Sequence, residues 1–309
     1  MNRRSGAWLS LVLVGLVSAG MAVRPVAAQE SAVAKAAPVR KALFWKATSG
    51  TNVTYLLGSI HLGSKSMYPL AKEVEDAFER STALIVEVDI NRVDAAGMQT
   101  MILASGVYTG DDTLWDHVNP ETRQKLEAFC DKYGFPAVAM AKLKPWVAAM
   151  TVAILPMSKN GMELGLGIDK YFLDKAVQTK KRVVEAESAE LQIKLLSGFS
   201  SEVQERYLAS ALEDDGQDKI KQIQDAWISG DAERIDRMQR EKSSVPEEVT
   251  KALLQGRNPH MADVAEQFLK GKDTGFMVVG AAHMVGANGV VRILQQRGYK
   301  VEQVPIAAR

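Results

Sequence analysis

Tyr55-Leu56-Leu57-Gly58-Ser59-Ile60-His61 lies near the start of the chain, and Phe276-Met277-Val278-Val279-Gly280-Ala281-Ala282-His283 lies near its end. Each stretch reads as a short apolar strand that ends in Gly-x-x-His. Glycine at this position permits a tight exit from the strand and a close approach of the backbone to a ligand. The repeated pattern therefore predicts that two strands, far apart in sequence, deliver the imidazoles of His61 and His283 to one edge of a sheet.

A third apolar run ends in acidic residues. Ala83-Leu84-Ile85-Val86 is typical of a buried strand and leads into Glu87-Val88-Asp89. Open α/β sheets place their sites at strand ends, and imidazoles with a carboxylate suit a divalent transition metal. The residues thus favour a metal site made of His61, His283 and Glu87. The alternative is that each histidine only hydrogen-bonds to the backbone at a strand end.

Residues 1–28 are typical of an export signal. Arg3 and Arg4 precede an apolar stretch from Trp8 to Val23, and a small-residue cleavage pattern follows at Val26-Ala27-Ala28. The apolar stretch is shorter than the roughly 20 residues that a membrane span needs. We expect cleavage, a periplasmic or secreted protein, and no stable membrane span; a retained anchor is the alternative.

Charge and cysteine content narrow the class of protein. The sequence holds 38 basic and 37 acidic residues; the signal contains three arginines, so 35 and 37 remain and the mature net charge is −2. This balance argues against a nucleic-acid partner. The single cysteine, Cys130, excludes an intramolecular disulfide and is interpreted as a buried, inert thiol. Stability must then come from an ordinary hydrophobic core.

The pattern of apolar residues predicts one α/β domain. Residues 29–41 are Ala-rich and contain Pro38, so we interpret them as a linker before a domain at 42–305. Strands are predicted at 43–45, 53–57, 83–86, 182–187, 275–279 and 299–304, the first two as a hairpin. The region of about 119–271 is mainly helical, and its apolar run at 147–155 is predicted to be a buried core helix. We expect a central mixed sheet flanked by helices, with a helical middle lobe.

The motifs together resemble the TraB/PrgY/GumN family, which is related to the Tiki metalloproteases and to the erythromycin-esterase/ChaN-like fold. The resemblance covers roughly residues 43–304 and rests on five motifs in order: Tyr55 to Gly63, Glu87-Val88-Asp89, Gly167-Ile168-Asp169 with Glu185 to Gln192, Arg257-Asn258 with Met261, and Val279 to Gly286 through Gly298-Tyr299. It implies that fold, with His61 and His283 as metal ligands and Glu87 as their acidic partner. Glu187 is the matching acid where family members often read Leu-Glu-Thr and this chain has Ala186-Glu187-Ser188.

The resemblance also implies a chemistry. Tiki-like relatives are metal-dependent peptidases that use manganese or cobalt, and zinc is a third candidate here. The expected function is an exported metal-dependent hydrolase, a peptidase by resemblance, acting on a peptide or small molecule. Glu87 or Glu187 could act as the general base, and Glu87 is favoured.

Three polar residues have both a structural and a functional interpretation. Arg257 could stabilise an oxyanion or bind a substrate carboxylate, or it could form a surface or interdomain salt bridge. Asn258 could orient a ligand, although capping of the following helix is favoured. Asp169 is interpreted as a cap or a charge in the first turn of its helix.

Other functions stay open. A non-catalytic periplasmic protein that binds a peptide, a polysaccharide precursor or haem is one alternative, and a regulatory protein that acts by contact alone is another. His117 and His260 lack the preceding glycine and are predicted to be ordinary surface or packing residues.

Overall fold

The computed structural model describes residues 39–213, 217–240 and 244–307. The predicted signal at 1–28 lies outside these ranges, as does the predicted linker up to residue 38. The last residues of that linker belong instead to strand β1 (Val39–Ser49). The sheet therefore begins at Val39, ahead of the domain start predicted at residue 42.

Six strands form one mixed sheet in the order β4-β3-β5-β2-β1-β6. Their bounds are β1 Val39–Ser49, β2 Asn52–Ser59, β3 Ala83–Val86, β4 Arg182–Glu185, β5 Gly275–Gly280 and β6 Lys300–Ala307. The neighbours β4, β3, β5 and β2 run parallel, whereas β1 is antiparallel to both β2 and β6. This arrangement confirms the predicted α/β class with a central mixed sheet.

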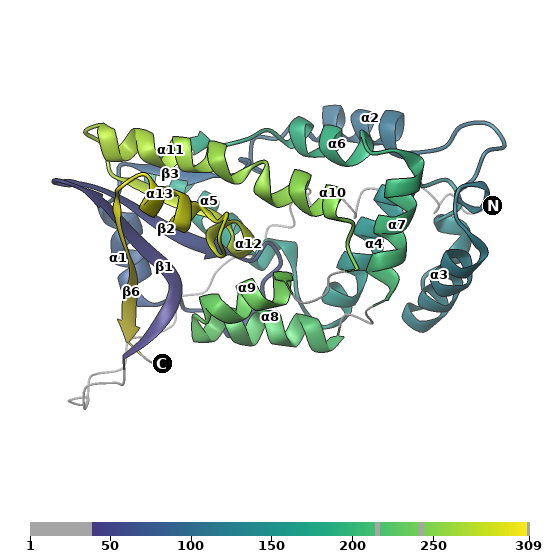
Figure 1. The fold of residues 1–309 in the computed structure, drawn as a ribbon, viewed down its shortest axis with the longest axis horizontal. Coiled ribbons are helices and arrows are strands. Elements are labelled where there is room, and N and C mark those ends of the chain that lie inside the picture. The colour runs from purple at the N-terminus through teal and green to yellow at the C-terminus, as the bar shows by residue number, and fades with distance from the viewer. Residues whose placement is uncertain (1–38, 214–216, 241–243, 308–309) are drawn as a thin grey trace.

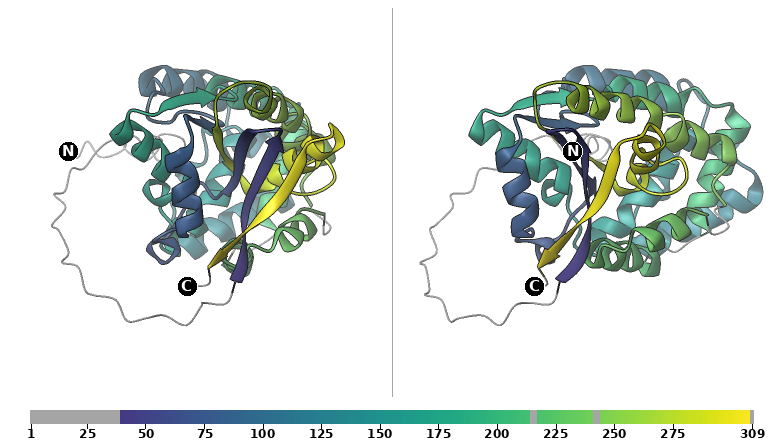
Figure 2. Two further views of the ribbon diagram at one scale, coloured as in Figure 1. Left: turned by 90° about the vertical axis from the view of Figure 1, so that its left-hand side faces the viewer. Right: turned by 60° about the vertical axis from the view of Figure 1, so that its left-hand side comes forward.

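The first and last strands lie side by side. Strands β1 and β2 form the predicted hairpin, in which Gly50 takes a positive φ of 58° in the turn. Strand β6 then pairs with the other side of β1, from Thr48↔Lys300 to Val39↔Ala307. Figure 2 shows these two strands, purple and yellow, crossing the same side of the molecule. The two ends of the described chain therefore close one edge of the sheet.

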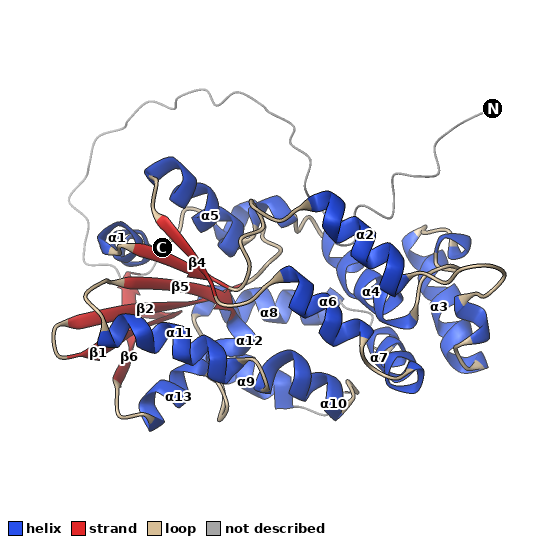
Figure 3. Ribbon diagram, turned by 90° about the horizontal axis from the view of Figure 1, so that it is seen from above, coloured by secondary structure: helices blue, strands red, loops and turns tan. Residues whose placement is uncertain are grey.

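Helices cover both faces of the sheet (Figure 3). Helices α1 (Lys72–Arg80) and α5 (Ile168–Thr179) lie on one face, and α11 (Asn258–Lys270) and α13 (Val290–Gln296) lie on the other. Successive side chains of a strand point to opposite faces, so Leu57 packs with the α1–α5 core while Leu56 packs with the α11–α13 core.

A helical lobe extends from the sheet (Figure 1). It consists of α2 (Ala95–Gly106), α3 (Pro120–Tyr133), α4 (Pro145–Lys159), α6 (Ala189–Ser197) and α7 (Ser201–Leu212), which surround a separate core that contains the fully buried Trp146. The predicted helix at 147–155 is thus a core helix of this lobe. The lobe begins earlier than the predicted residue 119, because α2 also belongs to it.

Four further helices follow the lobe along the described chain. These are α8 (Gln217–Ser229), α9 (Ala232–Arg240), α10 (Glu247–Thr250) and, after β5, α12 (Ala281–Met284). A π-helical turn (Lys251–Gln255) joins α10 to α11, and 3-10 turns lie at Lys65–Met67, Leu114–Asp116, Ala137–Ala139 and Leu164–Leu166. Within the described ranges, no helix combines the length and the apolar character that a membrane crossing requires.

Candidate functional site

Four neighbouring parallel strands each deliver a polar residue to the same edge of the sheet. His61 follows β2, His283 follows β5, Glu87 follows β3 and Glu187 follows β4. Because the carboxyl ends of parallel strands meet at one edge, residues from four distant parts of the sequence come together. The predicted delivery of both Gly-x-x-His imidazoles to one edge is therefore observed.

Both imidazoles face a single carboxylate oxygen. His61 Nε2 lies 3.8 Å from Glu87 Oε1, and His283 Nε2 lies 3.9 Å from the same atom. The side chain of His61 is 53% exposed, whereas those of His283 and Glu87 are 5% and 9% exposed. The cluster therefore has an open side at His61 and a buried side at His283.

The second nitrogen of His61 is held by Asp169. His61 Nδ1 lies 3.1 Å from Asp169 Oδ1, and Ser59 donates its hydroxyl hydrogen to the same oxygen. Asp169 does lie in the first turn of α5, but its carboxylate contacts His61 instead of serving only the helix. The structural interpretation of Asp169 from sequence is therefore incomplete.

The second nitrogen of His283 is held by Asn258. His283 Nδ1 lies 2.6 Å from Asn258 Oδ1, and Asn258 Nδ2 donates to the Asn288 carbonyl oxygen at 2.7 Å. Asn258 is the first residue of α11 and makes no capping hydrogen bond. The favoured capping interpretation is therefore wrong, and Asn258 orients an imidazole.

Arg257 joins the two buried glutamates. Its Nε donates to both carboxylate oxygens of Glu187 at 2.8 and 2.9 Å, and its NH2 group donates to Glu87 Oε2 at 2.7 Å and also to Glu187. NH1 donates to the Leu253 carbonyl oxygen at 2.8 Å. Gln192 adds longer contacts to Glu87 and Glu187 at 3.4 and 3.3 Å. Most donors of Arg257 are thus engaged by the protein. The residue does form salt bridges, but they are buried and not on the surface.

The remaining oxygen of Glu87 is fixed by the second Gly-x-x-His motif. The Gly280 N–H donates to Glu87 Oε1 at 2.7 Å. A Cβ added to Gly280 would lie 3.3 Å from that oxygen, and 3.5 Å from both His61 Nε2 and His283 Cδ2. Gly280 therefore keeps open the small space at which the two rings and the carboxylate converge.

The charges of the cluster shift the pKa values of the two histidines in opposite directions. The Asp169 carboxylate raises the pKa of His61 to about 10, whereas burial lowers the pKa of His283 to about 4. Burial alone would raise the pKa of Glu87, but the neighbouring His61, His283 and Arg257 outweigh it and lower that pKa. Glu87 is therefore a carboxylate that faces one cationic and one neutral ring.

The residue types at this edge, two imidazoles and a carboxylate, are ones that divalent transition metals accept as ligands. An oxygen acceptor engages the Nδ1–H of each ring, as the outer partners of metal-bound histidines do. His283 is then neutral and presents an Nε2 lone pair, whereas His61 carries an Nε2 proton that a metal would have to displace. Two ligands of one ion, each about 2.0–2.2 Å from it, stand at most about 4.4 Å apart, and both Nε2–Oε1 distances are within that limit. Among the described residues, no group of three or more His, Cys, Asp and Glu side chains is placed so that it could hold a metal ion as it stands. The two Nε2 atoms lie near one oxygen, Glu87 Oε1.

The other residues considered from sequence lie away from this cluster. His117 pairs with Asp112 and stacks on Tyr108 in the region of the lobe, and His260 is exposed on α11. Cys130 is fully buried in the lobe core. His117 and His260 are surface or packing residues, as predicted, and the predicted burial of Cys130 is confirmed.

Comparison with known proteins agrees with the motifs. The model of the TraB/PrgY/gumN family matches residues 43–303. The chain belongs to this family. It is 29% identical over 147 residues to the uncharacterized protein YbaP of Shigella flexneri and to that of Escherichia coli (strain K12), a match that covers 48% of this chain and 53% of each relative. The chain thus spans about half the length of the curated relatives it matches. No solved structure matches the chain.

Proposed function

We propose that this protein is an exported, metal-dependent hydrolase whose substrates are peptides. The observation that carries the proposal is the convergence of His61 Nε2 and His283 Nε2 on one oxygen, Glu87 Oε1, at 3.8 and 3.9 Å. Membership of the TraB/PrgY/gumN family supports the choice of these residues, and the relation to the Tiki metalloproteases that the motifs led us to expect supports a peptidase. The signal-like sequence at 1–28 supports export.

His61, His283 and Glu87 would hold the metal, with manganese, cobalt and zinc as the candidates. Such an ion would polarise a scissile carbonyl and lower the pKa of a water molecule toward about 7. The chain contributes the orientation of its own donors: Asp169 holds His61, Asn258 holds His283, and the Gly280 N–H holds Glu87 Oε1.

Glu87 is the proposed proton acceptor as well as the acidic ligand. Glu87 Oε1 lies 3.8 Å from Nε2 of His61 and 3.9 Å from Nε2 of His283, and the lowered pKa of Glu87 keeps the carboxylate ionised. Glu187 is less suited to this role because its side chain is only 1% exposed and both its oxygens accept from Arg257. We assign Glu187 and Arg257 to positioning. Glu187 accepts from Arg257, Arg257 donates to Glu87 Oε2, and Glu87 Oε1 faces the histidines.

Substrate would reach the centre from the side of His61. Its side chain is half exposed, whereas His283, Glu87 and Arg257 are nearly buried. A group on the substrate would therefore meet the Nε2 face of His61 first, with Glu87 behind it.

The proposal is tested on purified residues 29–309 by metal analysis and by cleavage of a peptide library, each with and without a chelator. The matched variants are His61→Ala with His283→Ala, and His117→Ala with His260→Ala, which together use all four histidines of the chain. We expect the first pair to lose bound metal and chelator-sensitive cleavage, and the second pair to retain both. Absence of bound manganese, cobalt and zinc under every loading condition would contradict the proposal. Metal binding without cleavage of any peptide would favour the non-catalytic binding protein.

A further inference from the structure

The carbonyl oxygen of Gly58 has an unusual partner at the exit of strand β2. Pairing of β2 with β5 continues to Ser59↔Gly280, but pairing of β2 with β1 ends at Leu57↔Phe44. Beyond this point the Gly58 carbonyl accepts a hydrogen bond from the indole Nε1 of Trp227, at 2.7 Å. A side chain 169 residues away therefore bonds to the backbone at the first glycine of a Gly-x-x-His motif.

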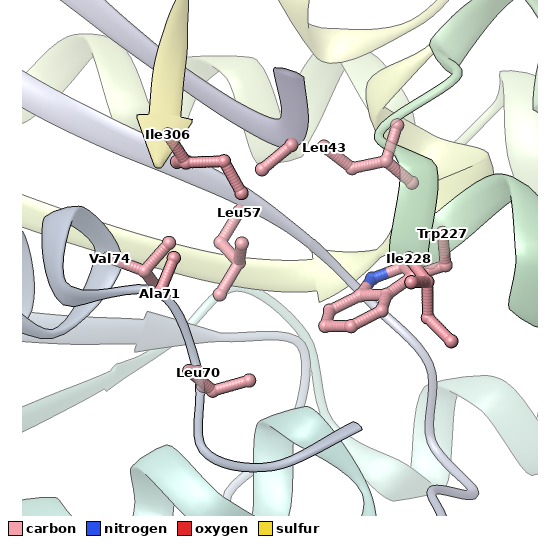
Figure 4. Close-up of a pocket in the computed structure, with 9 residues that line it drawn as sticks. Leu43, Leu57, Leu70, Ala71, Val74, Trp227, Ile228 and Ile306 are labelled. Atoms are coloured by element: carbon pink, nitrogen blue, oxygen red, sulfur yellow. The ribbon is translucent and has the colours of Figure 1, made fainter. Parts of the chain in front are cut away.

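Trp227 is anchored by packing on both sides of this contact. It lies in α8, which packs on β1, and its half-buried ring contacts the cores on both faces of the sheet. Figure 4 shows the ring beside Leu57 and Ile228, at an apolar cavity of about 30 Å³ that Leu43 and Ile306 also line. The side chains that line this cavity are apolar, so they offer the indole N–H no alternative acceptor on that side.

Gly58 is also the point at which the two Gly-x-x-His motifs touch. A Cβ added to Gly58 would lie 3.1 Å from Cα and 3.2 Å from Cβ of Ala281, which lies between Gly280 and His283. The backbone of the first motif thus rests against the backbone of the second, and Trp227 holds the carbonyl at that point. A shift of the β2 exit would therefore change the separation between His61 and the His283–Glu87 pair.

We infer that the indole N–H of Trp227 is a positioning group for the centre: it fixes the exit of β2 and so sets His61 relative to His283 and Glu87. Of the two tests below, the manganese titration rests on the proposed metal-binding function, and the NMR measurement does not. Trp227 itself touches neither ring, and its effect is transmitted through the backbone from Gly58 to His61.

The test compares two equivalent substitutions. Trp227→Phe keeps most of the aromatic ring and removes the N–H donor. Trp146→Phe is the control, because Trp146 Nε1 also donates to a backbone carbonyl, that of Ser105 at 3.3 Å, but in the core of the lobe. Loss of one hydrogen bond that positions a metal-binding residue corresponds to about a tenfold change in the affinity for the metal. We expect manganese to bind Trp227→Phe about tenfold more weakly than wild type and to bind Trp146→Phe as tightly as wild type. Both variants are expected to lose some thermal stability.

A second readout does not need a metal. The chain has four histidines, so their imidazole nitrogen resonances can be followed individually by NMR. We expect Trp227→Phe to move the resonances of His61 and leave those of His117 and His260 in place. Unchanged His61 resonances in a folded Trp227→Phe protein, or manganese affinity equal to wild type, would overturn the inference. If wild type binds none of manganese, cobalt and zinc while the His61 resonances still move, the metal proposal fails and the positioning role of Trp227 stands.

Discussion

His283 donates from Nδ1 to the side-chain oxygen of Asn258 at 2.6 Å, inside a part of the site where both residues are buried. The amide leaves the ring neutral, and burial lowers the pKa of His283 further. A neutral imidazole with its Nδ1 hydrogen engaged presents an Nε2 lone pair, which is the form that binds a metal.

Asn258→Ala should therefore weaken metal binding. Loss of an outer partner of a metal-bound histidine typically costs about 10- to 100-fold in affinity, and we expect a loss in that range by isothermal titration with manganese. The control is Asn160→Ala, which removes a carboxamide that only bonds the Pro156 carbonyl at the end of α4. Equal manganese affinity in Asn258→Ala and Asn160→Ala would contradict the orienting role.

Asp169→Asn should lower the pKa of His61. The substitution keeps an oxygen acceptor for His61 Nδ1 but removes the charge that raises the pKa of this ring. We expect the His61 pKa, followed by NMR, to fall toward its ordinary value, and the ring to lose the charged partner that holds its Nδ1–H. Asp174→Asn is the control, since Asp174 lies on the same helix and pairs with Lys170. A His61 pKa that responds equally to both changes would exclude a specific Asp169–His61 pair.

The sequence predicted the parts of this site that follow from strand ends. His61, His283 and Glu87 each come directly after an apolar run, and parallel strands bring such positions to one edge by topology alone. Asp169 and Asn258 lie at helix starts, where local rules favour a capping role. Their partners lie 108 and 25 residues away along the chain, and a local pattern contains no signal for that contact. Only the family motifs that contain these residues set them apart.

The helical lobe was predicted less completely than the sheet for a related reason. Helix α2 is almost uniformly apolar or small, Ala-Ala-Gly-Met-Gln-Thr-Met-Ile-Leu-Ala-Ser-Gly, so its sequence carries no clear alternation between a buried and an exposed face. Helix α1, in contrast, buries Val74, Ala77 and Phe78 at helical spacing, which is the periodic pattern that α2 lacks. No role for Trp227 could be predicted from the sequence, because its hydrogen bond to the Gly58 carbonyl forms where the pairing of β1 with β2 ends.

Arg257→Ala should destabilise the fold strongly. The guanidinium is the main partner of Glu187 and of Glu87 Oε2, whose side chains are 1% and 9% exposed. Removal of one partner from a buried ion pair leaves an uncompensated charge and costs about 3–5 kcal/mol. Chemical denaturation should show a loss of that order in the free energy of unfolding. Arg206→Ala is the control, since its pair with Glu248 is exposed and such pairs contribute about 0–1 kcal/mol. Similar losses in the two variants would argue against a buried charge network at the site.

Cys130 should be unreactive in the folded protein. Burial raises the pKa of its thiol to about 11, and the side chain is fully buried in the lobe core. Native protein at neutral pH should therefore resist a thiol reagent, and denatured protein should react fully. Because the folded pKa lies above the ordinary value of 9.0, this group favours folding below pH 9 and loses that contribution as the pH rises toward about 11. Cys130→Ala should lack this part of the pH dependence, and rapid labelling of the native thiol would contradict the prediction.

Gly280→Ala should block the centre with little loss of the fold. The added methyl group would stand 3.3 Å from Glu87 Oε1 and 3.5 Å from His61 Nε2, in the space that these donors share. The backbone N–H that binds Glu87 is retained, and the φ of −47° suits alanine. We expect manganese affinity to fall by about tenfold or more, equivalent to about 1.4 kcal/mol, while the unfolding midpoint changes little. Gly165→Ala is the control, because a Cβ there meets nothing within 4 Å. If Gly280→Ala binds manganese as Gly165→Ala does, the metal cannot occupy the space between the two rings and the carboxylate, and the proposed centre must lie elsewhere.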